Sequence, residues 1–198
     1  MGALLSLLVL VAVTTPNPDL AAAEKQLEDF RYGEAERSLV KALGTPDNDR
    51  ATILRIYELR GILDAIAGKR TAVEHFGRLL ALDPERTLAR DLGPRILTPF
   101  YEARGRLGDN PPVQLEATAA PGEKEQHLTV KLTSDSFGLG AWVKLWWRVG
   151  NGEWQSKAEP EVAGSATVDQ VVLAEAVEYY AQLLNADEGV LLESASAA

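Results

Sequence analysis

The spacing of apolar side chains along this chain changes near residue 111. Between residues 19 and 107, apolar side chains recur mostly every three or four positions, as in Leu59, Ile62, Leu63 and Ile66. That spacing is the period of a helix with one buried face. From residue 113 onward, apolar and polar side chains alternate, as in Val143–Val149, which is the period of a half-buried strand. The pattern therefore predicts an α+β chain with its helices first.

Glycine and proline divide the helical half into segments. Helical spacing covers residues 19–43, 50–67 and 71–82, and a further helical pair is expected at 86–92 and 99–107. Gly44 and Pro46 separate the first two segments, Gly68 separates the next two, and Pro84 follows the third. Both residue types favour turns over helix interiors. The sequence thus predicts three helical segments and a further helical pair, which together make two hairpins and a capping helix.

Short alternating segments make up the second half. They cover residues 113–117, 128–132, 143–149 and 177–183, with turns rich in glycine or asparagine at 138–140, 150–152 and 185–189. Several short strands at this spacing predict an antiparallel β-sandwich. Pro111 and Pro112 cannot continue a helix and favour an extended linker. We therefore predict a helical domain at 18–108, a linker at 109–112 and a sandwich at 113–198, each with its own core.

Two helical segments share a pattern of small and large residues. Ala35, Leu39 and Ala42 recur as Ala72, Phe76 and Leu79, and Pro84 closes the second copy. This pattern resembles the second helix of the tetratricopeptide repeat, although Leu79 departs from its small residue. The resemblance covers about residues 19–107 and implies stacked hairpins with a concave surface that holds a peptide or a partner helix. A small helical bundle without a groove is the alternative.

The β half resembles fibronectin type III and related immunoglobulin-like sandwiches. Leu173 precedes Tyr179 by six positions, and Tyr179 matches the tyrosine that anchors a corner of these folds through its hydroxyl. The chain has no cysteine, which favours the fibronectin-like branch over disulfide-bonded antibody domains. Trp147 alternates in phase with Val143 and Leu145, so we predict that it is the buried tryptophan of the sandwich.

The opposite phase of the same strand carries aromatic rings interleaved with cations. Trp142, Lys144, Trp146 and Arg148 alternate onto one side, and Trp154 lies across the following turn. Such side chains stack on one another, form a protein interface or stack on a sugar. Three roles remain open for them: packing within the fold, contact with a partner protein, or carbohydrate binding.

Basic side chains are candidates for the surface of the helical half. The ones we single out for partner binding are Arg31, Arg60 and Arg70, and Arg55 and Arg78 also belong to this group. A concave repeat surface would gather them to hold a peptide. Solvated helix faces explain most of them equally well.

The N-terminal residues predict export. Residues 4–13 are apolar except for Ser6, a run too short to cross a bilayer but typical of the core of a secretory signal. We therefore predict a signal peptide at residues 1–15, a periplasmic or secreted protein, and no transmembrane span in the mature chain. No Lys or Arg precedes the run, so a misassigned start codon and a buried helix remain alternatives.

The charge distribution and the lack of known catalytic and metal-binding motifs exclude several classes of function. The net charge is −9; residues 1–110 carry 16 acidic and 15 basic side chains, and residues 111–198 carry 13 and 5. A polyanion such as nucleic acid is repelled by the second half. The two histidines, His75 and His127, lie in different predicted domains, and no zinc, phosphate-loop or nucleophile-elbow motif occurs. We predict no catalytic site, no cofactor and no metal.

These patterns lead to a hypothesis for function. We expect a non-catalytic, exported scaffold or adaptor that mediates protein–protein interaction in a bacterial cell-envelope complex. The alternative is a cell-wall or carbohydrate-binding module that uses its exposed tryptophans. An enzyme whose site the sequence does not reveal is the third possibility.

Overall fold

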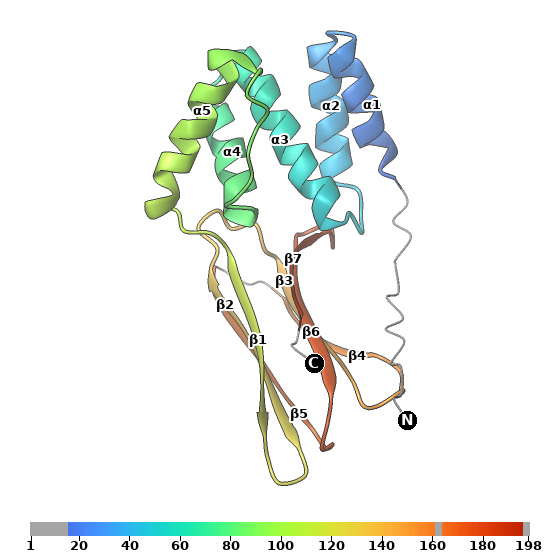
Figure 1. Cartoon of the computed structure of the whole chain (residues 1–198). Coiled ribbons are helices and arrows are strands. Elements are labelled where there is room, and N and C mark those ends of the chain that lie inside the picture. Colours follow the sequence, from blue (N-terminus) through green and yellow to red (C-terminus); the bar gives the residue numbers. More distant parts are fainter. Residues whose placement is uncertain (1–15, 161–163, 196–198) are drawn as a thin grey trace, which may run out of the picture.

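The computed structural model describes residues 16–160 and 164–195, and it places five α-helices before seven strands (Figure 1). The α-helices are α1 (Pro18–Glu28), α2 (Tyr32–Leu43), α3 (Arg50–Ile66), α4 (Thr71–Leu82) and α5 (Gly93–Gly105), and α5 continues into a short 3-10 turn, Arg106–Gly108. The strands are β1 (Gln114–Pro121), β2 (Gln126–Ser134), β3 (Trp142–Arg148), β4 (Gln155–Pro160), β5 (Ala166–Val172), β6 (Glu178–Leu184) and β7 (Val190–Ala195). The predicted α+β class with a C-terminal sandwich is confirmed. The predicted signal peptide lies outside the described residues.

Local side chains start the helices at α1 and α3. Asn17 precedes α1, and its Oδ1 accepts a hydrogen bond of 3.0 Å from the amide of Leu20. Asp49 caps α3 in the same way through the amide of Thr52, at 2.7 Å. These contacts satisfy amides that have no partner within the first helical turn. None of the helices in the described part of the chain is long and apolar enough to cross a membrane.

Two expectations for the helices are wrong. The segment 19–43 is not one helix, because Phe30 adopts a left-handed φ of 58° between α1 and α2. That conformation ends α1 and lets the amide of Arg31 bond back to the carbonyl of Gln26 at 2.7 Å. Residues 86–92 are not helical, and Pro94 lies in the first turn of α5, where its fixed φ favours a helix start.

The helices pack as two antiparallel hairpins and a fifth helix. α1 and α2 form the first hairpin, α3 and α4 form the second, and α5 packs on α4 and α3 (Figure 1). The repeated small and large residues lie in the contacts between helices, since Ala35 and Leu39 are fully buried and Phe76 is covered beside Gly61 of α3. Small residues let the helix axes approach, and the large ones fill the space between them.

The strands form two antiparallel sheets packed face to face. One sheet has the order β1-β2-β5 and the other has the order β4-β3-β6-β7. β1, β2, β3 and β6 coincide with the alternating segments of the sequence. β4, β5 and β7 have no counterpart among these alternating segments. The side chains of β4 are all exposed, so no alternation marks this edge strand.

The prediction for the buried tryptophan is confirmed, and the one for the tyrosine corner is not. Trp147 is 8% exposed and packs between the sheets with Val143 and Leu145. The ring of Tyr179 packs against the same core. Its hydroxyl has no hydrogen-bond partner among residues 16–160 and 164–195, so the corner contact of related sandwiches is not seen.

The helices are fixed to one end of the sandwich. The amide of Val190 at the start of β7 bonds to the carbonyl of Asn48 at 2.8 Å, and the amide of Val113 bonds to the carbonyl of Ala81 at 2.8 Å. Phe137, in the turn between β2 and β3, lies against Gly77 of α4. The larger cluster of buried side chains therefore runs from the helices into the sandwich, and the expectation of two separately packed cores is wrong.

Candidate binding surfaces

The most aromatic surface lies on the outer side of the four-stranded sheet. Alternate residues of β3 are buried between the sheets, so the intervening side chains point outward. The strand register places Tyr180 of β6 directly opposite Trp146, and Gln182 opposite Lys144. On the other side, β4 brings the small residues Ser156 and Ala158 next to them. We call this surface the aromatic face; its members are Trp142, Lys144, Trp146, Arg148, Trp154, Tyr180 and Gln182.

The rings of the aromatic face contact one another across the strands. Trp146 and Tyr180 stack with their centroids 5.9 Å apart and their planes 11° apart. Trp154, which precedes β4, meets Tyr180 edge-on at a centroid distance of 5.0 Å. Aromatic pairs of this kind contribute about 0.5–1.5 kcal/mol beyond the area they bury. Trp146, Tyr180 and Trp154 thus form one cluster.

Cations lie over two of these rings. The Nζ of Lys144 is 4.2 Å from the centroid of the Trp146 ring. The guanidinium carbon of Arg148 is 4.8 Å from the centroid of Trp154. Arg148 is also held by Glu178, whose Oε2 accepts a bond of 3.0 Å from its Nε. A ring face with a bound cation is less open to a ligand than a bare one.

A polar chain fixes the orientation of the central indole. Nε1 of Trp146 donates to Oε1 of Gln182 at 2.9 Å, and Nε2 of Gln182 donates to Oε2 of Glu193 at 3.0 Å. Burial raises the pKa of Tyr180, and the carboxylate of Glu193 adds to the rise. The side chains of the face are therefore held in place before any partner arrives, which lowers the ordering cost of binding.

One end of the aromatic face is hollowed. A depression of about 150 Å³ is lined by Trp142, Lys144, Ala158, Leu184 and Glu188. At the other end Trp154 is 39% exposed. The face thus combines a ring that stands in solvent with a recess of side-chain size.

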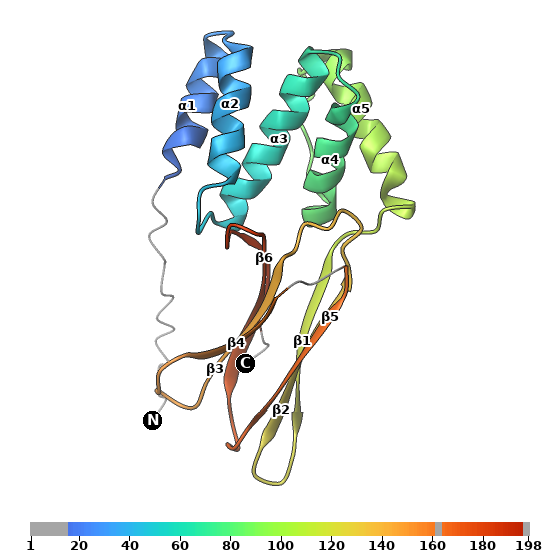
Figure 2. The same ribbon diagram turned by 180° about the vertical axis from the view of Figure 1, so that it is seen from behind.

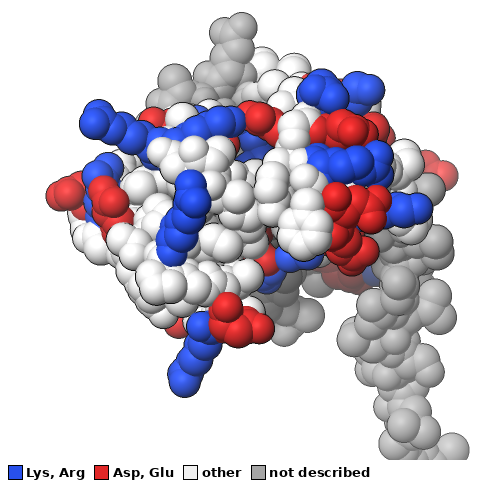
Figure 3. All heavy atoms as spheres, turned by 90° about the horizontal axis from the view of Figure 1, so that it is seen from above, with Lys and Arg blue, Asp and Glu red and all other residues white. Residues whose placement is uncertain are grey.

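The tryptophans and cations of the sandwich that we predicted for partner binding all lie on this face. The arginines predicted for partner binding in the helical half do not come together on one surface. Arg31 lies at the α1–α2 turn and binds Asp29 and Glu34, each at 3.0 Å. Arg60 is half-buried on α3, and Arg70 is exposed before α4. Seen from the helical end, basic and acidic side chains are interspersed, with uncharged surface between them (Figure 3).

Sequence reasoning did not name the β6 members of the aromatic face, Tyr180 and Gln182. A signal for them was present, because Val177, Tyr179 and Ala181 alternate toward the core. The residues between them must then point outward. What the sequence does not reveal is that β6 lies next to β3 rather than elsewhere in the sheet.

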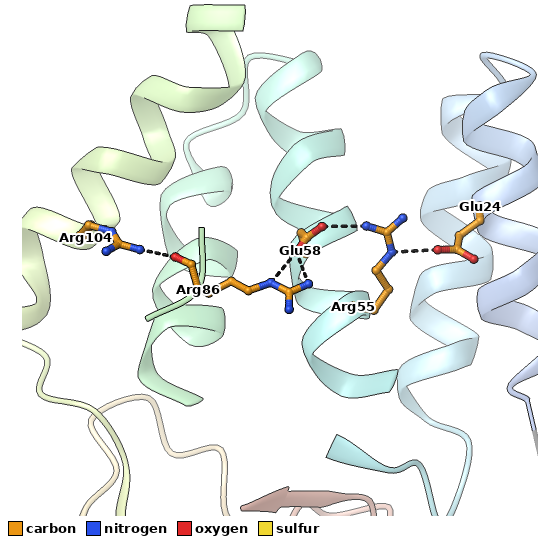
Figure 4. Close-up of polar contacts among 5 residues, drawn as sticks. All are labelled: Glu24, Arg55, Glu58, Arg86 and Arg104. Atoms are coloured by element: carbon orange, nitrogen blue, oxygen red, sulfur yellow. Dashed lines mark hydrogen bonds and ion pairs between the residues drawn. The ribbon is translucent and has the colours of Figure 1, made fainter. Parts of the chain in front are cut away.

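A chain of charges crosses one side of the helices (Figure 4). Oε1 of Glu58 accepts a bond of 2.7 Å from Arg55, and its Oε2 accepts bonds of 2.9 and 2.6 Å from Nε and Nη2 of Arg86. Arg55 also donates to Glu24 of α1 at 2.8 Å, and Arg104 of α5 donates to the carbonyl of Arg86. This network joins α1, α3 and α5 through the connection after α4.

The connection between α4 and α5, residues 83–92, lies against this side of the helical array (Figure 1). It is held there through Arg86, whose side chain reaches Glu58 of α3 and whose carbonyl is bound from α5. The chain itself therefore fills part of the surface between α3 and α5. A second depression, of about 830 Å³, lies between the start of α4 and α5 and includes Arg70, Glu74 and Arg95 in its lining.

Asp64 and His75 form a buried polar contact between α3 and α4. Oδ2 of Asp64 accepts a bond of 2.6 Å from the hydroxyl of Thr71 and lies 3.4 Å from Nε2 of His75. Lys69 is 3.1 Å from the other carboxylate oxygen. Burial lowers the pKa of His75 to about 4, with Arg60, Arg78 and Lys69 acting in the same direction and Asp64 opposing them. The imidazole is therefore neutral at pH 7.

We expect this histidine to make the fold less stable in acid. Its pKa is about 4 in the folded chain and about 6.5 when unfolded, so the unfolded chain binds more protons between these values. The stability contributed by the neutral His75 side chain is fully present above pH 6.5 and decreases as the pH falls toward 4. Linkage gives a loss of about 2 kcal/mol between pH 7 and pH 5. Chemical denaturation of His75→Gln should lack this part of the pH dependence, whereas exchange of the exposed His127 for Gln should retain it.

Within the described residues, no group of three or more His, Cys, Asp or Glu side chains is arranged to hold a metal ion. The chain matches no protein family, no curated protein and no solved structure.

Proposed function

We propose that this protein is a non-catalytic adaptor that binds a partner protein through the aromatic face of its sandwich. The observation that carries the proposal is the cluster of Trp146, Tyr180 and Trp154, fixed by hydrogen bonds and cations on an outer sheet surface. Large aromatic residues with arginine are the side chains that most often dominate binding energy at protein interfaces. Their fixed orientation reduces the entropy that binding must overcome.

The contacts of this face favour a protein over a sugar. A sugar ring packs flat on an open aromatic ring, but Trp146 already has Tyr180 and Lys144 against its ring, and Trp154 has Tyr180 and Arg148. A protein partner can use the exposed edges of these rings and place one side chain in the recess beside Trp142. Carbohydrate binding is therefore the second candidate.

The architecture supports an adaptor with its two halves held at a fixed angle. The helical hairpins resemble tetratricopeptide repeats in their alternation of helices and in the burial of Ala35, Leu39, Ala72 and Phe76. In the sandwich, the fourth strand pairs with β3 rather than extending the β1-β2-β5 sheet, unlike the constant-type antibody arrangement. These features support the resemblance to a fibronectin-like module. The apolar N-terminal run is the basis for proposing export to the cell envelope.

Site-specific photo-crosslinking in the producing cell tests the proposal. A crosslinking amino acid at Ser156, next to Trp146 on the aromatic face, should capture a defined protein. The same residue at Lys131, exposed on β2 of the other sheet, should not. The capture should disappear in Trp146→Ala/Tyr180→Ala when circular dichroism shows that the variant is folded.

Two results would contradict this function. One is equal capture from Ser156 and Lys131, or capture that survives the double substitution. The other is a tryptophan fluorescence shift on adding purified cell-wall glycan that Trp146→Ala abolishes, which would replace the adaptor by the carbohydrate-binding module.

A further inference from the structure

Two arginines on the seam between α3 and α4 make no ion pair with any acid in the part of the chain that the structure describes. Arg60 is half-buried, and it makes no hydrogen bond or ion pair with any residue of the described ranges. Arg78 is also half-buried, and its one hydrogen-bond contact is from Nη1 to Nδ1 of His75 at 3.4 Å. Guanidinium groups are rarely removed from water without an acceptor, because each carries five donors. Two arginines without an ion pair are unusual in a chain with 29 acidic side chains and a net charge of −9.

The helix geometry brings these side chains together. Arg60 and Asp64 lie one turn apart on α3, and His75 and Arg78 lie one turn apart on α4. Asp64 contacts His75 across the seam, and His75 contacts Arg78. The two guanidiniums therefore extend one line of polar side chains between the helices, with the buried Tyr57 one turn further along α3.

The acids of the seam are already engaged elsewhere. Asp64 accepts from Thr71 and pairs with Lys69, and Glu36 of α2 pairs with Lys69 at 2.7 Å. Burial lowers the pKa of Arg60, and the positive charge of Arg78 acts in the same direction. The carboxylate of Asp135, which acts on Tyr57 together with Arg60 and Arg78, accepts hydrogen bonds from the amides of Leu139 and Gly140. None of these three carboxylates makes an ion pair with Arg60 or Arg78, so both guanidiniums keep donors for an acceptor from outside the chain.

α2 reaches one end of the seam. α3 runs between α2 and α4 (Figure 2), and the pair of Glu36 with Lys69 links α2 to the α3–α4 turn. Val40, one turn after Glu36 on α2, is 54% exposed and offers an apolar contact.

We propose that Arg60 and Arg78 together bind a carboxylate of an acidic peptide segment from a partner protein, as a second docking point away from the aromatic face. A carboxylate accepts two parallel bonds from guanidinium groups, and it brings only one negative charge to the seam. Phosphate, which carries more negative charge at pH 7, is disfavoured by Glu36 and Asp64 at the same seam. The inference does not depend on the aromatic face, which lies on the sandwich.

A capped tetraglutamate peptide is a direct probe. Titrating it into the labelled full chain at constant ionic strength should shift the Nε–H resonances of Arg60 and Arg78 along one saturating curve. Exchange of either residue, in Arg60→Gln or Arg78→Gln, should weaken binding at least tenfold. Exchange of Arg95, which lines the separate depression beside α5, should leave the curve unchanged, as should Trp146→Ala.

The free protein supplies a second readout. Because burial, and then the charge of Arg78, disfavour the charged form of Arg60, Arg60→Gln should keep or raise the melting temperature in carboxylate-free buffer. A fall of several degrees would show that the fold itself uses Arg60 and would overturn the proposal. Peptide-induced shifts spread over all arginines, or inorganic phosphate binding more tightly than the peptide, would also overturn it.

Discussion

Replacing Glu58 by alanine should lower the free energy of unfolding by about 3 kcal/mol. The Glu58 side chain is 11% exposed and accepts from both Arg55 and Arg86. Its removal leaves Arg86 without a carboxylate acceptor and leaves Arg55 with Glu24 alone, and breaking a buried pair in this way is far costlier than losing a surface one. Both arginines partly reach water, which keeps the cost at the lower end for buried pairs. Urea denaturation of the full chain measures it.

Matched variants separate the network from a general charge effect. Glu34→Ala breaks an exposed pair with Arg31 and should cost less than about 0.5 kcal/mol. Glu58→Ala combined with Arg86→Ala should cost less than the sum of the two single changes, since both remove the same contact. Equal losses in Glu58→Ala and Glu34→Ala would contradict the role of the network.

Gly61→Ala should destabilise the protein by about 3 kcal/mol, opposite to the usual effect of this exchange in a helix. A Cβ at position 61 would lie 2.5 Å from Cε1 of Phe76. Phe76 is fully buried and meets Phe100 edge-on at 5.4 Å, so its ring has no room to move away. Either the ring or the α3–α4 spacing must shift. Thermal and urea denaturation should both show the loss.

Gly33 of α2 is the matched control for this exchange. No atom lies within 4 Å of a Cβ built there, so Gly33→Ala should raise the free energy of unfolding by about 0.5–1 kcal/mol through lower entropy of the unfolded chain. Phe76→Leu should reduce the cost of Gly61→Ala, because a smaller side chain leaves space for the added methyl. A stabilising effect of Gly61→Ala would show that α3 and α4 do not approach as closely as described.

The junction of helices and sandwich gives the proposed adaptor a fixed geometry. The hydrogen bonds from Asn48 to β7 and from Ala81 to Val113, together with the contact of Phe137 with Gly77, hold the two halves in one orientation. A partner on the aromatic face and an acidic segment at Arg60 and Arg78 would therefore be held at a constant separation. This follows from the shared core, which a flexible linker would not provide.

The order and kind of the elements follow from local sequence patterns alone. The change from helical to alternating spacing predicted helices before strands, and the phase of β3 placed Trp147 inside and Trp142, Lys144, Trp146 and Arg148 outside. These predictions succeed because the period of a segment is a local property of its side chains. The sequence pattern did not predict the split between α1 and α2, because the split depends on Phe30, a non-glycine residue with positive φ. No composition rule marks such a residue.

Which side chains meet depends on how the elements pack in three dimensions. Tyr180 reaches Trp146 because β6 pairs with β3, and Arg86 reaches Glu58 because residues 83–92 return along α3. Arg31, Arg60 and Arg70 are equivalent candidates in the sequence, yet Arg31 pairs with neighbouring acids, while Arg60 is half-buried and makes no ion pair within the described residues. Contacts between residues far apart in the chain depend on strand order and helix packing, and the spacing of apolar residues within a segment carries no information about either.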